Sequence, residues 1–163
     1  MFGKKKAGSQ PFVLQVLTTD YLLEGTVPGN TYLVVGTPIS LSPAQIQCTT
    51  SAAIPAQTLA QFVVMGGGSV AFIPRGEIEQ LEQYAVWKQY KNAMPGDYYV
   101  GPYVMRGRMM GLSMGLLEAE APIFDVHITC QVPGSTWPGL YAPLAVVNTH
   151  WVAGYIPDLA GNG

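Results

Sequence analysis

The stretch Ser69–Glu77 reads SVAFIPRGE, and the stretch Trp151–Leu159 reads WVAGYIPDL. Each contains a Val-Ala pair that is followed closely by Ile-Pro. Short runs rich in β-branched and aromatic residues are typical of β-strands, and a proline is typical of a strand end. Two such similar phrases in one chain indicate an internal repeat.

A shift of 82 positions brings the two halves of the chain into register. The residues that then coincide include the pairs Tyr21 and Tyr103, Gly25 and Gly107, Cys48 and Cys130, and Val64 and Val146. One extra residue near Gly154 is needed to bring Ile73-Pro74 onto Ile156-Pro157. We predict a tandem duplication in which the two phrases are the closing strands of the copies. The alternative is two unrelated segments of similar β composition.

The predicted organisation has five parts. A basic tail covers 1–10, a first β module 11–75, a linker helix and turn 76–96, a second β module 97–158, and a tail 159–163. In the first module we expect strands at Phe12–Leu17, Tyr21–Val27, Thr31–Val35, Ala44–Thr49, Ala60–Val64 and Ser69–Ile73. Short strands separated by Gly and Pro predict a mostly β fold, with each module a small barrel or sandwich. The Ile78, Leu81 and Ala85 spacing predicts a helix over Glu77–Lys91.

Composition limits the class of protein. Of 163 residues, 48% are hydrophobic and only 11% are charged, well below the roughly 25% charge of an average soluble domain. A surface with so few charges favours contacts with copies of the chain or with a partner. No apolar run is long enough to span a bilayer, and the basic start lacks a cleavage site, so we expect a cytoplasmic protein.

The first module resembles the Sm-like small β-barrels of uncharacterised bacterial type. The resemblance rests on DYLLEGTV at Asp20–Val27, on the turn Pro28-Gly29-Asn30 and on GGGSVAFIP at Gly66–Pro74; in the second copy it covers only Tyr103–Met109 and Val152–Ile156. It implies a bent strand with a central glycine, and rings and RNA binding in the better-known members. The PGN turn departs from the pattern expected for RNA contact, as does the absence of an arginine before the glycines at Gly66.

Cysteine, histidine and methionine side chains are the candidate chemical groups of the chain. We expect Cys48 and Cys130 to be small core residues on equivalent strands, with a thiol nucleophile or metal pair as the alternative. His127, His150 and Asp125 hold the residue types of a metal site but not its spacing. Met105, Met109, Met110 and Met114 predict adaptable packing. No triad, metal spacing or phosphate loop is present, so we expect no enzyme activity and no cofactor.

The function expected from these observations is structural. We predict a non-enzymatic protein that self-associates through β edges and aromatic patches into a ring, shell or filament. The interface candidates are Tyr98, Tyr99, Tyr103, Trp137, Tyr141, Trp151 and Tyr155. One alternative is an RNA-binding or regulatory barrel that contacts phosphates through Lys4, Lys5, Lys6, Arg106 and Arg108. The other is an adaptor subunit of a larger complex.

Overall fold

The computed structural model describes residues 10–51, 55–65, 68–88, 93–110 and 119–158, and these residues form a mostly β fold, as predicted. The first half contains β1 (Phe12–Thr18), β2 (Tyr21–Val27), β3 (Ile39–Leu41), β4 (Ala44–Cys48), β5 (Gln57–Leu59), β6 (Phe62–Val64) and β7 (Val70–Arg75). The second half contains β8 (Met94–Val100), β9 (Tyr103–Met109), β10 (Glu120–Cys130), β11 (Leu140–Asn148) and β12 (Val152–Pro157). Between the halves lie a 3₁₀ turn, η1 (Ile78–Gln80), and the helix α1 (Glu82–Trp87), and a second 3₁₀ turn, η2 (Thr149–Trp151), joins β11 to β12.

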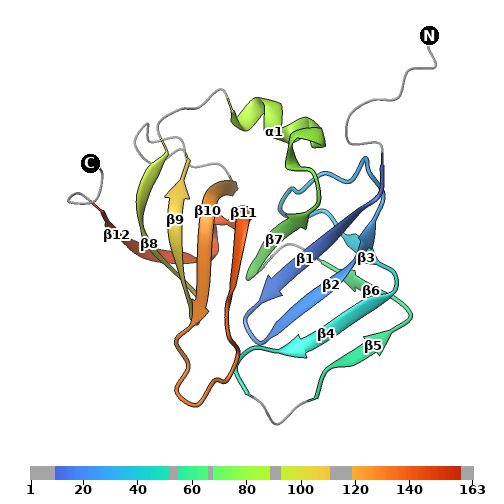
Figure 1. Cartoon of the computed structure of the whole chain (residues 1–163), viewed down its shortest axis with the longest axis horizontal. Coiled ribbons are helices and arrows are strands. Elements are labelled where there is room, and N and C mark those ends of the chain that lie inside the picture. Colours follow the sequence, from blue (N-terminus) through green and yellow to red (C-terminus); the bar gives the residue numbers. More distant parts are fainter. Residues whose placement is uncertain (1–9, 52–54, 66–67, 89–92, 111–118, 159–163) are drawn as a thin grey trace.

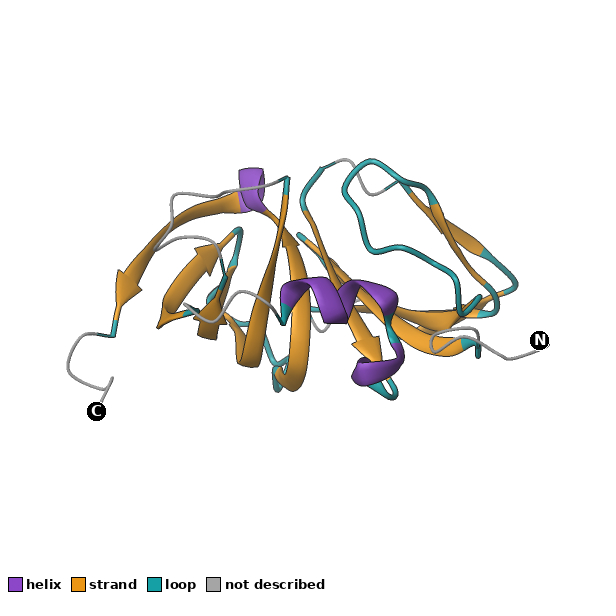
Figure 2. Ribbon diagram, turned by 90° about the horizontal axis from the view of Figure 1, so that it is seen from above, coloured by secondary structure: helices purple, strands orange, loops and turns teal. Residues whose placement is uncertain are grey.

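One large antiparallel sheet runs through both halves of the chain. Its strand order is β12-β8-β9-β10-β11-β7-β1-β2-β4-β5, and β3 pairs with β6 in a second, two-stranded sheet (Figure 1). The sheet is strongly curved, and α1 lies beyond the ends of its central strands, above β11 and β7 in the view of Figure 1 (Figures 1 and 2). The expected pair of barrels is therefore not seen as two closed bodies: in the described part of the chain the hydrogen-bonded order is open, with β12 and β5 at its ends.

The strands repeat with the shift found in the sequence. β1 and β8, β2 and β9, and β7 and β12 have bounds that differ by 82 positions. Val70 lies opposite Thr18 in the first half, and Val152 lies opposite Val100 in the second. The register of β12 against β8 then shifts between Val152 and Gly154. The extra residue needed by the alignment is thus a β-bulge, which inserts one residue into one strand of a pair.

The two halves differ where long strands bend. β10 is continuous in the second half, whereas its counterpart is divided into β3 and β4 around Pro43. Asp125 occupies the equivalent place in β10, with a φ of 52° at a register irregularity. Pro43 lacks the N–H that a ladder needs, and the first-half strand is divided at this residue. Similarly, β11 is continuous but β5 and β6 are separate strands.

Glycines at the centre of β2 and β9 let neighbouring strands approach closely. A Cβ on Gly25 would lie 2.7 Å from the Cβ of Leu41, and one on Gly107 would lie 2.8 Å from the carbonyl oxygen of Phe124. Both distances are shorter than real contacts allow, so a side chain at either position would push the strands apart.

Two predicted elements differ from the structure. Thr31–Val35 is not a strand, because side chains bind its backbone: the Leu33 N–H donates to Gln83 Oε1 at 3.1 Å and the Val35 N–H to Glu120 Oε1 at 3.3 Å. The helix expected over Glu77–Lys91 is interrupted at Leu81, which is extended (φ −75°, ψ 129°). Burial of Ile78 and Leu81 against the first-half core holds this break in place; residues 89–91 lie outside the described part.

Two apolar clusters form the core, and each draws on both halves. The first consists mainly of second-half residues but includes Leu17, Leu22, Ala71 and Ile73 of the first half. The second consists mainly of first-half residues but includes Leu144 and Val146, with Phe124 packed against it. Because apolar burial is the main stabilising term in folding, the two halves stabilise each other.

Candidate self-association surface

The internal junction, defined as the contact between the two halves, is centred on β11 and β7. These strands pair antiparallel, with Val146 opposite Phe72 and Val147 opposite Ala71. All four side chains are fully buried. The pairing satisfies main-chain groups of β7 and β11 that would otherwise form sheet edges, and side chains directly opposite each other share a face.

Apolar side chains of the first half extend this junction into the second half. Leu17 and Ile73 are 0% exposed and Leu22 is 4% exposed, all in the cluster formed mainly by the second half. From the opposite direction Val146 enters the first-half core. Each half therefore inserts apolar side chains into the core of the other.

A buried hydroxyl network closes the junction on one side. The Tyr103 hydroxyl donates to the carbonyl of Thr18 at 2.6 Å and lies 2.5 Å from Thr49 Oγ1. Since a phenol has one proton, the Thr49 hydroxyl donates to Tyr103. Ser135 Oγ donates to the Thr49 carbonyl at 2.6 Å. Burial raises the pKa of Tyr103 well above its usual value, so this hydroxyl stays protonated and able to donate.

A further hydrogen bond crosses the junction near η2. Asn148 is 3% exposed, and its Nδ2 donates to the carbonyl of Gly68 at 2.5 Å. Its Oδ1 accepts from the His150 N–H at 3.0 Å. The buried amide is therefore paired at both ends, as buried polar groups require.

Four described strands, β12, β5, β3 and β6, have a partner on one side only. Of these four, β12 and β6 carry exposed large apolar side chains, and these two are called the free edges. Ile156 and Tyr155 on β12 are 56% and 40% exposed, and Val63 on β6 is 47% exposed. Met65, directly after β6, is 69% exposed. Exposed strand edges that carry apolar side chains are sites at which another strand can add.

The predicted interface aromatics fall into three groups. Tyr98 and Tyr103 are fully buried in the core. Trp137 and Trp151 are partly buried and pack edge-on against Tyr103. Tyr99, Tyr141 and Tyr155 are exposed, and Tyr155 stacks on Tyr98 with ring centroids 5.3 Å apart. Of the seven candidates, the three in the exposed group present the most aromatic surface on the single chain.

Three exposed apolar residues at the free edges were not among the interface candidates predicted from the sequence. Val63, Met65 and Ile156 are among the most exposed apolar side chains described. The signal available was the alignment of Ile156 with the buried Ile73, and of Val63 with the region of Val146. That alignment shows which positions of the two halves are equivalent. It does not show at which of the two positions the side chain is buried.

Of the predicted phosphate contacts, the described part of the chain contains Arg106 and Arg108. Lys4, Lys5 and Lys6 lie outside the described residues. Arg106 forms an ion pair with Asp97 at 3.2 Å, and Arg108 forms one with Asp125 at 3.5 Å. Each arginine on this face is thus matched by a carboxylate, which lowers the attraction for a polyanion.

The other chemical groups remain separate. His127 packs against Tyr141 at a centroid distance of 4.8 Å, and the Tyr141 hydroxyl donates to Asp125 Oδ1 at 3.2 Å. Cys48 and Cys130 are unpaired thiols, both half-buried, and the hydrogen bond with the Thr50 hydroxyl lowers the pKa of Cys48. Within the described ranges, no group of three or more His, Cys, Asp or Glu is placed to bind a metal.

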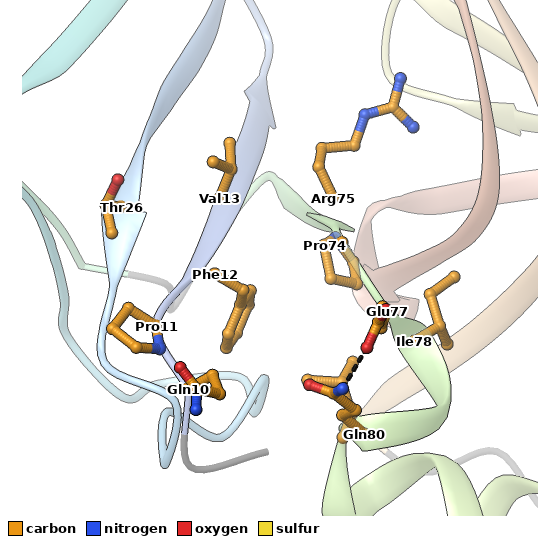
Figure 3. A pocket seen from close by; sticks show the side chains of 12 residues that line it. Gln10, Pro11, Phe12, Val13, Thr26, Pro74, Arg75, Glu77, Ile78 and Gln80 are labelled. Carbon is orange, nitrogen blue, oxygen red and sulfur yellow. Dashed lines mark hydrogen bonds between the residues drawn. The ribbon is translucent and has the colours of Figure 1, made fainter. Parts of the chain in front are cut away.

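A cavity of about 540 Å³ opens between the start of β1 and η1. Figure 3 shows Gln10, Pro11 and Phe12 on one wall and Glu77 and Gln80, which are hydrogen bonded to each other, on the other. A specific ligand site needs polar groups that converge on a common point. The polar groups of this cavity are few and do not converge in this way.

No protein-family model, curated protein or solved structure matches the chain. Among the described helices, none has the length and apolar character required to cross a membrane.

Proposed function

We propose that this protein is a non-enzymatic structural subunit that associates head to tail with copies of itself. One observation carries the proposal: residues that are buried at the internal junction have exposed apolar equivalents at the two free edges. β12 is the equivalent of β7, and β6 lies in the region equivalent to β11. The contact between halves of one chain is therefore the template for the contact between chains.

The equivalent positions can be compared one by one. Leu17 is 0% exposed and its counterpart Tyr99 is 42% exposed; Ile73 is 0% exposed and its counterpart Ile156 is 56% exposed. On the opposite edge the strand pairing matches Val63 to Val146, because Val63 lies opposite Ser40 as Val146 lies opposite Pro122. Val146 is 0% exposed, whereas Val63 is 47% exposed. Covering such side chains contributes about 25 cal/mol for each Å² of apolar area buried, which favours association.

The proposed contact has a direction. β12 and β6 are different surfaces, so the contact is heterologous, and it closes into a ring or continues as a filament according to the rotation at each step. The Sm-like likeness is part of this proposal and is supported by the close-approach glycines Gly25 and Gly107. An RNA-binding barrel and an adaptor subunit stay as the alternatives, and a cytoplasmic location is retained with two free thiols in its support.

The first test is the molar mass of the purified chain by light scattering, at low and high salt. We expect a mass that is a multiple of 17.5 kDa and that persists in salt. Ile156→Asp and Val63→Asp each place a charge on one edge and should reduce the mass to that of a single chain. Val86→Asp is the matched control, because Val86 is 52% exposed on α1, away from both edges.

Mixing the two edge variants tests direction. Ile156→Asp keeps β6 intact and Val63→Asp keeps β12 intact, so a mixture should form dimers with one copy of each variant and grow no further. Failure of the mixture to associate would exclude the head-to-tail arrangement. A wild-type chain that stays monomeric at every concentration would exclude self-association altogether.

A further inference from the structure

The internal junction also defines which residues would face each other between chains, an inference that rests on the proposed function. To transfer the register, β6 must first be matched to β11. Ile39 lies opposite Val64 in the first half, and Ala121, which is 82 positions after Ile39, lies opposite Val147 in the second. Val64 therefore corresponds to Val147, a shift of 83 rather than the 82 of the sequence alignment.

Burial supports the shift of 83 independently. Val64 is 6% exposed and Val147 is 0% exposed, and each belongs to the main cluster of its own half. With the same shift Val63 corresponds to Val146, which enters the core of the other half at the internal junction. Val63 is 47% exposed in the single chain, as expected for a side chain whose receiving core belongs to another copy.

The other strand of the contact is matched in the same way. After the bulge in β12, Tyr155 lies opposite Tyr98 as Phe72 lies opposite Val16, and Gly154 lies opposite Tyr99 as Ala71 lies opposite Leu17. Phe72 therefore corresponds to Tyr155, and Ala71 corresponds to Gly154.

We propose that β6 of one copy pairs antiparallel with β12 of the next, with Val63 opposite Tyr155 and Val64 opposite Gly154. The chain accommodates this register. Tyr155 is already held by stacking on Tyr98, which gives Val63 a flat aromatic surface. A Cβ at Gly154 would have no atom within 4 Å, so the strand approaching Gly154 meets open space.

Replacing the residues of the internal junction by their counterparts also places a tyrosine at the contact between chains. At the internal junction the Tyr103 hydroxyl donates to the Thr18 carbonyl at 2.6 Å and lies 3.3 Å from that of Thr19. Tyr21 is the counterpart of Tyr103, and the counterparts of Thr18 and Thr19 are Val100 and Gly101. Tyr21 of one copy would thus donate to the Val100–Gly101 turn of its neighbour.

A one-residue slip would have a clear consequence. Because strand side chains alternate between faces, the register implied by the uncorrected shift of 82 would place Val64 opposite Tyr155 and turn Val63 away from the second-half surface that it fits. The register is therefore open to a direct chemical test.

The test uses paired cysteines in a parent chain that carries Cys48→Ser and Cys130→Ser. Opposed cysteines on neighbouring strands fall within the 4.4–6.8 Å Cα separation of a disulfide. Val63→Cys with Tyr155→Cys, and separately Val64→Cys with Gly154→Cys, should give a ladder of covalent multimers on mild oxidation. The matched control, Met65→Cys with Tyr155→Cys, is displaced by two residues and should crosslink at least tenfold less.

The outcomes separate the register from the proposed function. A ladder for both opposed pairs but not for the displaced pair supports the register, and the second pair leaves Tyr155 intact. If the parent associates by light scattering but only the displaced pair crosslinks, or no pair does, the register is wrong and self-association stands. If the parent is monomeric where the wild type is also monomeric, the proposed function fails and the register fails with it.

Discussion

The internal junction and the two free edges are built from equivalent strands, yet only the junction is covered. At the junction, Phe72 and Val146 are fully buried opposite each other. At the edges, their counterparts Tyr155 and Val63 are 40% and 47% exposed. Apolar character is thus preserved at positions where the single chain has no core to fill.

The polar contacts of the two regions differ more than the apolar ones. Asn148 reaches across the internal junction to Gly68, but the position equivalent to Asn148 is Met65, directly after β6. Thr49, which completes the hydroxyl network, is replaced in the second half by Gln131. An inter-chain contact built on this template therefore has fewer buried hydrogen bonds, and we expect it to be weaker than the contact within the chain.

The largest expected difference between the two regions is in stability. Phe72→Ala should lower the free energy of unfolding by about 3–5 kcal/mol, since it removes a fully buried ring. Tyr155→Ala should lower it by less than about 1 kcal/mol, because that ring is 40% exposed. Urea unfolding at a concentration where the chain is monomeric measures both. Equal losses of unfolding free energy in the two variants would show that Phe72 and Tyr155 are buried to the same extent.

The next effect concerns the hydroxyl network. Tyr103→Phe should cost about 1–3 kcal/mol of folding stability, because it leaves buried groups at Thr18 and Thr49 without their partner. Tyr21→Phe is the matched change at the other region and should alter stability by less than about 0.5 kcal/mol. It should instead weaken association, by about tenfold in the dissociation constant measured by dilution. A stability loss from Tyr21→Phe as large as that from Tyr103→Phe would contradict the comparison.

The repeat could be predicted from the sequence because the residues that reveal it are required by contacts within each half. Pairs such as Gly25 and Gly107 are matched in the sequence itself, and each glycine is required by a close strand contact within its own half. The bulge at β12 was visible as one extra residue near Gly154. The repeat of strands in the two halves therefore depends on strand pairing within each half and on the spacing of residues along the chain.

The joining of the halves could not be predicted, since it depends on contacts between distant segments. Nothing in the sequence of β7 or β11 states that they pair with each other rather than with a second chain. The absence of a strand at Thr31–Val35 has the same origin, because its backbone binds Gln83 and Glu120, far along the chain. Likewise, Tyr98 and Tyr99 alternate, but only the packed structure shows that Tyr98 faces the core.

A smaller effect should appear at alkaline pH. Burial raises the pKa of Tyr98, which lies under the free edge strand β12, to about 12, against about 10 in an unfolded chain. The folded state holds this proton more tightly, so its contribution to stability is complete below pH 10 and is lost as the pH rises toward 12. Between pH 9 and 11 the free energy of unfolding should fall by roughly 1 kcal/mol on account of Tyr98. Tyr98→Phe should remove that part of the fall, as measured by urea unfolding at several pH values. If the unfolding free energy of the variant falls with pH as steeply as that of the wild type, the pKa of Tyr98 is not raised by folding.

The smallest expected effect is electrostatic, and it separates the apolar edge from the charged face beside it. Arg106, whose side chain is 66% exposed, pairs with Asp97 on β8, the strand next to β12. Exposed ion pairs contribute between about 0 and 1 kcal/mol, so Arg106→Ala should change stability by about 0.5 kcal/mol or less. Association should also persist at 1 M salt, because apolar contacts are not screened, whereas phosphate binding weakens steeply. Urea unfolding of Arg106→Ala measures the change in stability, and light scattering of the same variant across a salt series measures association. An assembly that dissociates in salt would favour the charged face over the strand edges as the contact.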